Sequence, residues 1–138
     1  MSYISLRDGV ELLAAPANEQ VERLDHWFRE ITGGGSAEAY GNYELLAGYC
    51  EDVIAMSYLV QIGQVTNTEA DAMLRLDTFI GETIKDEDFY ERDALFSDPR
   101  WEGIRIAARE VLAELPDKSS DTEWMKKFFG QTPEEPIA

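Results

Sequence analysis

The chain has 138 residues and a formal net charge of −16, from 12 basic and 28 acidic side chains. This length is ordinary for one domain, and a hydrophobic content of 44% supplies enough apolar surface for one buried core. Because a surface this acidic repels nucleic-acid phosphates and anionic lipid heads, we expect no direct contact with nucleic acid or membrane and favour a basic protein partner.

Two helices are predicted near the N-terminus. Residues 5–15 place apolar side chains at helical spacing and are closed by Pro16. A second helix is predicted from Asn18, as its N-cap, to about Ile31. The glycines at 33–35 then indicate a linker, and they lack the Gly-Lys-Ser/Thr ending that a phosphate-binding loop requires.

The most apolar segment runs from Tyr43 to about Gln61. A helix that is apolar around most of its circumference is usually buried, so we expect this one at the centre of the bundle. Its apolar positions include Leu45, Leu46, Tyr49, Val53, Ile54, Met56 and Tyr58. Residues 66–69, Thr-Asn-Thr-Glu, fit a capping box that starts the next helix, which fades near Ile84.

The C-terminal third predicts two more helices. Asp98 and Pro99 mark the start of the first, with a capping carboxylate followed by proline at the first helical position. A short helix is predicted at 122–129, before a frayed tail. We therefore expect an all-α, single-domain bundle of about five to six helices, with 1–116 as the core domain and 117–138 as a short helix and tail.

The predicted C-terminal helix carries the large apolar side chains Trp124, Met125, Phe128 and Phe129. Leaving them in water is costly, so we expect the helix to dock. Docking on the chain's own core is the favoured interpretation. Docking on another copy would make the protein a self-associating structural or adaptor domain, which we keep as an alternative.

Few side chains suggest catalysis. Cys50 has no partner for an internal disulfide, and its anionic neighbours Glu51 and Asp52 disfavour a reactive thiolate. His26 is the one histidine, which excludes His-rich metal sites, and no serine lies in a Gly-x-Ser-x-Gly elbow. We expect no catalytic residue, no metal and no cofactor.

The best cluster of carboxylates is Glu19, Glu22 and Asp25, whose spacing of three places them on one helical face. Such a face can hold Mg²⁺, so a small Mg²⁺- or Mn²⁺-dependent helical hydrolase is a second alternative. Carboxylate-bridged metal sites also need a complementary set on a facing helix, and the sequence offers none with matching spacing. A solvated helix face is the favoured interpretation.

Residues 86–98 form the most acidic stretch, with six carboxylates against one base, Arg92. Interspersed aromatic and leucine side chains predict that part of this stretch docks on the core. We expect the stretch to contact the basic partner. The candidate partner-binding residues are Asp86, Glu87, Asp88, Tyr90, Glu91 and Asp93. A solvated acidic loop without a partner is the alternative.

Motifs along the chain carry a family resemblance. Arg7-x-x-Val10, Gln20 and Trp27 come early, and an apolar central helix and an acidic middle follow. The sharpest motif is Asp98-Pro99-Arg100-Trp101-x-x-Ile104-x-x-Ala107-Ala108-x-x-x-Leu112. This arrangement resembles small acidic bacterial immunity-type proteins associated with polymorphic toxins. Such families share no catalytic residues, so the resemblance implies a stoichiometric protein inhibitor.

Charge and resemblance together predict an immunity- or antitoxin-like protein that neutralises a cationic toxin, for example a nuclease. Carboxylates would stand in for phosphates at the basic residues of the toxin, and buried aromatic side chains would supply most of the binding energy. We expect a cytoplasmic monomer or weak homodimer with a cognate toxin as its partner. Acidity that only maintains solubility stays open as an alternative.

Overall fold

A computed structural model of the chain describes residues 2–32 and 41–118. Every regular element within these ranges is a helix, which confirms the predicted all-α, single-domain fold. The glycine linker predicted at 33–35 and the helix predicted at 122–129 lie outside the described residues.

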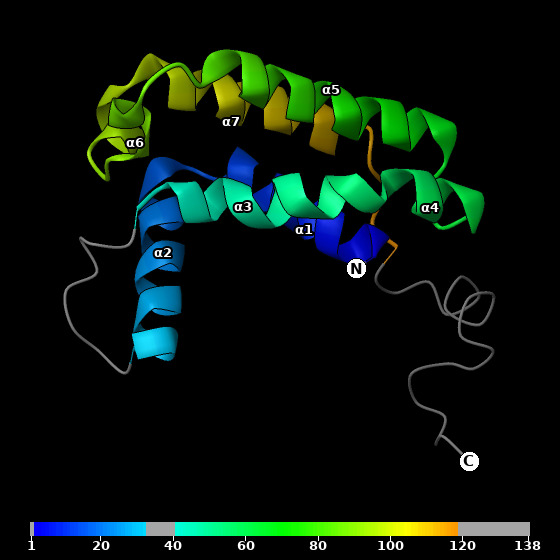
Figure 1. Cartoon of the computed structure of the whole chain (residues 1–138), viewed down its shortest axis with the longest axis horizontal. Coiled ribbons are helices and arrows are strands. Elements are labelled where there is room, and N and C mark those ends of the chain that lie inside the picture. The colour runs from blue at the N-terminus through cyan, green and yellow to red at the C-terminus, as the bar shows by residue number, and fades with distance from the viewer. Residues whose placement is uncertain (1, 33–40, 119–138) are drawn as a thin grey trace.

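The helices form two layers, and α2 extends from one end of the layer that contains α3, at a steep angle to α3 and away from α5 (Figure 1). Helices α5 and α7 run side by side in one layer, and α1 lies between α7 and α3, with α4 continuing the line of α3 (Figure 1). The α-helices are α1 (Tyr3–Ala14), α2 (Ala17–Thr32), α3 (Tyr43–Asp52), α4 (Met56–Gln61), α5 (Asn67–Thr83), α6 (Ala94–Ser97) and α7 (Pro99–Leu112), and the 3-10 turns are η2 (Val53–Ala55) and η3 (Glu87–Tyr90).

Helix α1 occupies the centre of the bundle, because it packs on α3 and on α7. Its start is fixed by a capping box between Ser2 and Ser5. The side-chain amide of Gln20 donates to the carbonyls of Leu12 and Leu13, which satisfies backbone acceptors at its other end. Its fully buried side chains, each at 0% exposure, are Tyr3, Leu6, Val10 and Leu13.

The segment from Tyr43 to Gln61 differs from the prediction of one central helix. The turn η2 interrupts it between α3 and α4, and two of its apolar side chains face outward, with Ile54 82% and Tyr58 60% exposed. A 3-10 turn has fewer residues per turn than an α-helix, so it shifts the apolar stripe relative to the core. The central position predicted for this segment is therefore wrong, and α1 holds it.

A buried arginine joins three helices. Arg105 of α7 is only 5% exposed. Its Nη1 donates to Oε1 of Gln20 in α2 and its Nη2 to the carbonyl of Leu95 in α6, both at 2.9 Å. Its Nε donates at 2.9 Å to Glu102, which supplies the compensating charge. The network fixes α6, and with it the chain that precedes α7.

Candidate partner-binding site

The predicted partner-binding residues lie in the connection between α5 and α7, and we call residues 86–93 the acidic loop. One aromatic side chain anchors this loop to the core. Phe89 is fully buried and stacks on Trp101, with ring centroids 4.4 Å apart and an interplanar angle of 5°. The indole Nε1 of Trp101 also donates to the carbonyl of Phe89 at 2.7 Å. The ring stacking and the indole hydrogen bond together hold the backbone of η3 against α7.

Arg100 forms a second anchor at the start of α7. Its guanidinium makes two hydrogen bonds to Asp86, each 3.1 Å long, and further bonds to Asp98. It also lies 5.3 Å from the centroid of the Phe89 ring. Hydrogen bonds from Arg100 lower the pKa of both carboxyl groups. Asp86, predicted to contact a partner, is therefore engaged within the fold.

The lowered pKa of Asp98 predicts how stability depends on pH. A carboxylate with a lower pKa in the folded state stabilises the fold above its unfolded pKa of about 3.9, and this contribution disappears as the pH falls through the folded value. We expect Asp98→Asn to reduce the unfolding free energy at pH 7, and the gap to the parent to close in acid. Urea unfolding from pH 7 to pH 2 measures this gap. A gap that stays constant over that range would contradict the role of Asp98.

The opposite side of the acidic loop is held by α2 and by the start of α3. The backbone N–H of buried Asn42 donates to the carbonyl of Tyr90 at 3.0 Å, and its side-chain amide donates to the carbonyl of Glu91. Arg92 reaches Asp25 of α2 with a distance of 3.0 Å between Nη2 and Oδ1. The loop backbone is therefore fixed from both sides by residues distant in sequence.

Four of the predicted carboxylates take no part in these anchors. The side chains of Glu87, Asp88, Glu91 and Asp93 are exposed, and no basic side chain within residues 2–32 and 41–118 forms an ion pair with them. The loop thus combines a constrained backbone with four uncompensated charges. Of the six predicted residues, Asp86 is also exposed but pairs with Arg100, so these four form the exposed anionic part without an ion pair.

An aromatic pair borders the acidic loop. Tyr90 is half-buried and meets Tyr43 edge to face, with ring centroids 5.8 Å apart and an interplanar angle of 75°. Tyr43 is 53% exposed, and Phe96 of the adjoining α6 is 64% exposed. Sequence reasoning missed Tyr43, because it reads as the first apolar residue of a core helix. The sequence offers only a weak signal for its exposure: Tyr43 stands at the very start of that helix, and no residue of a predicted apolar stripe lies opposite it.

The structure also describes the two other candidates from the sequence, the carboxylate cluster on α2 and the cysteine. Asp25 pairs with Arg92, while Glu19 and Glu22 are exposed. Within the described ranges, no three His, Cys, Asp or Glu side chains form a group suited to a metal ion. Burial, followed by the nearby charge of Asp77, raises the pKa of the Cys50 thiol to about 11. This thiol is therefore protonated at neutral pH, as the sequence predicts.

Fold and loop together define an acidic helical protein with a constrained anionic surface. The chain matches no protein-family model, no curated protein and no solved structure. In the part of the chain that the structure describes, no helix has the length and apolarity required to cross a membrane.

Proposed function

We propose that the chain is an immunity-type inhibitor that holds a cationic protein toxin through the acidic loop. The observation that supports this proposal is the combination of an anchored loop backbone with four exposed carboxylates, Glu87, Asp88, Glu91 and Asp93. A solvated loop that serves only solubility has no need for anchors on three helices.

The physical advantage of this arrangement is preorganisation. A surface whose backbone is already fixed loses little conformational freedom on binding, so more of the interaction energy appears as affinity. Clustered carboxylates attract a basic partner and increase the rate of encounter. The overall charge of −16 adds to the same field.

The Tyr43–Tyr90 pair supplies the apolar part of the proposed surface. Aromatic side chains near the centre of an interface contribute much of its binding energy when surrounding residues exclude water. Here the exposed ring of Tyr43 contacts Tyr90, which belongs to the acidic loop itself. A basic cleft with a hydrophobic floor is the complementary shape, as in an enzyme that acts on polyanions.

Co-expression tests the proposal in cells. The probe is the polypeptide encoded next to this chain, expressed in a bacterial host with and without it. We expect the neighbour to arrest growth and the chain to restore it. A variant with Glu87, Asp88, Glu91 and Asp93 changed to lysine should restore growth poorly at equal expression. A neighbour that is harmless, or a toxic neighbour that the chain leaves active, would contradict the proposal.

A further inference from the structure

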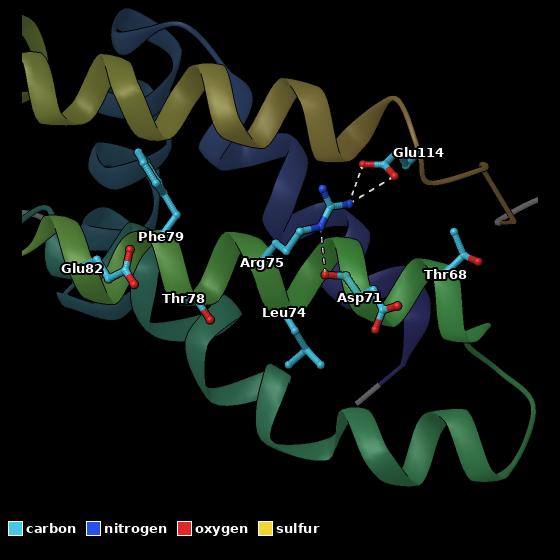
Figure 2. Close-up of a pocket in the computed structure, with 8 residues that line it drawn as sticks. All are labelled: Thr68, Asp71, Leu74, Arg75, Thr78, Phe79, Glu82 and Glu114. Carbon is cyan, nitrogen blue, oxygen red and sulfur yellow. Dashed lines mark hydrogen bonds and ion pairs between the residues drawn. The ribbon is translucent and has the colours of Figure 1, made fainter.

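A hollow runs along the outer side of α5, where α7 flanks it (Figure 2). This groove has a volume of about 840 Å³ and is lined by apolar as well as charged side chains. Leu74 is 41% and Phe79 38% exposed, which is high for large apolar residues that line a groove. Phe79 leans toward α7, where its Cζ lies 3.7 Å from the position that a Cβ of Gly103 would take (Figure 2).

The charge of the groove is negative. Asp71, Glu82 and Glu114 line it, with Arg75 as the one basic lining residue within the described ranges. The guanidinium of Arg75 binds Glu114 through Nη2, at 3.0 and 3.2 Å to its two carboxylate oxygens (Figure 2). Asp71 and Glu82 have no ion-pair partner in that part of the chain. An occupant that suits this groove is apolar and carries positive charge.

The last described residue lies at one end of the groove. Lys118 donates from Nζ to Glu69 Oε1 at 2.8 Å and to the carbonyl of Gln64 at 3.2 Å. Glu69 belongs to the first turn of α5 and is adjacent to Thr68, which lines the groove. The described part of the chain therefore ends close to one end of the groove.

We propose that residues 124–129 of this chain occupy the groove as an intramolecular helix. Their sequence, Trp-Met-Lys-Lys-Phe-Phe, joins four large apolar residues to two lysines and contains no acid. At helical spacing Trp124 and Phe128 share one face with Met125 and Phe129, while Lys126 and Lys127 flank it. The apolar face covers Leu74 and Phe79, and the lysines approach Asp71 and Glu82.

The connecting chain is long enough for this arrangement. Six residues lead from Lys118 to Trp124, and an extended chain covers about 20 Å in that number. From Thr68 to Thr78 the rise along α5 is about 15 Å at 1.5 Å per residue. The segment thus reaches the middle of the groove. Charge, apolar content and the point of exit all favour this segment over a second copy of the chain.

Quenching of tryptophan fluorescence by acrylamide tests the proposal on the full-length chain. A Trp27→Phe background leaves two tryptophans, Trp101, which is 0% exposed, and Trp124, which serves as the reporter. We expect Trp124 to be quenched several-fold more slowly than in a synthetic peptide of residues 119–138. Leu74→Ser with Phe79→Ser should remove this protection. Ile54→Ser with Tyr58→Ser, which alters two exposed apolar residues of the α3–α4 segment, should leave it unchanged.

A second variant tests the groove without removing apolar side chains, whose loss could unfold the chain. Asp71→Lys with Glu82→Lys alters only exposed charges of the groove and should also expose Trp124. Quenching equal to that of the free peptide in the parent, or protection that persists in both groove variants, would overturn the proposal. Protection that falls on dilution, together with a change from dimer to monomer in sedimentation, would assign the groove to a second copy and would equally overturn it.

Discussion

Changing all four exposed carboxylates of the acidic loop to lysine is expected to slow association with the proposed cationic partner by on the order of 100-fold at low salt. The parent loop attracts the partner, and the variant loop loses this attraction while the anchors Trp101 and Arg100 stay in place. The association rate of the parent should fall steeply with added salt, and that of the variant should depend on salt much less. Stopped-flow mixing with the toxin proposed as the partner, over a range of NaCl concentrations, measures both effects.

A control variant distinguishes the effect of the loop charges from the effect of the net charge of the chain. It makes the same change in total charge at four exposed acids that lie outside the loop and in no ion pair within the described ranges: Glu22, Glu51, Glu82 and Glu110. We expect this control to slow association far less than the loop variant. Equal slowing by the two variants would show that overall charge alone drives the encounter, and the loop would lose its special role.

Replacing Arg105 by methionine is expected to lower the unfolding free energy by about 2–4 kcal/mol. Methionine retains much of the apolar stem but donates no hydrogen bond. Gln20 Oε1 and the carbonyl of Leu95 would then be buried acceptors without their donor. Gln20 is 0% exposed, so water reaches it only if the structure opens. Urea unfolding at pH 7 measures the loss.

Arg75→Met is the matched control for this experiment. Arg75 also pairs with a carboxylate, but its side chain is 65% exposed, and exposed pairs contribute only about 0–1 kcal/mol. A loss for Arg105→Met as small as that for Arg75→Met would contradict a structural role for the buried network. Because the network fixes α6 next to the acidic loop, Arg105→Met should also weaken partner binding.

Local sequence signals predicted the helix boundaries well. The capping box at Thr66 and Glu69 is present, with both reciprocal hydrogen bonds. Asp98 caps α7 by accepting from the backbone of Arg100, and Pro99 is its first residue. Capping depends on residues within one turn of each other, so a sequence pattern can identify it. By contrast, α2 begins at Ala17, and Asn18 lies within its first turn instead of capping it.

The arrangement of the helices was less predictable. Hydropathy indicated that residues 43–61 are buried on most sides, yet Ile54 and Tyr58 face outward and α1 is the central helix. A helix becomes central because two others pack on it. The apolar stripe of α1 is narrower than that of residues 43–61, but it is fully buried. Sequence periodicity identifies an apolar face but does not identify what covers it.

The negative charge of the candidate site could be predicted from the sequence, but the contacts that hold its backbone in place could not. Exposure of Glu87 and Asp88 follows from an acidic run. The pairing of Arg92 with Asp25 joins residues 67 positions apart, and no local pattern reports it. The contact of Tyr43 with Tyr90 is likewise a product of the fold. These long-range contacts turn an acidic segment into a constrained surface.

Carboxyl labelling tests the central claim most directly. Carbodiimide coupling of an amine to exposed carboxylates, read by mass spectrometry, compares the free chain with its proposed complex with a toxin. If the acidic loop is the binding surface, labelling of Glu87, Asp88, Glu91 and Asp93 should fall strongly in the complex, while Glu51 and Glu110 keep their labelling. Unchanged labelling of the loop in a stable complex, with protection at Glu51 or Glu110 instead, would contradict the claim.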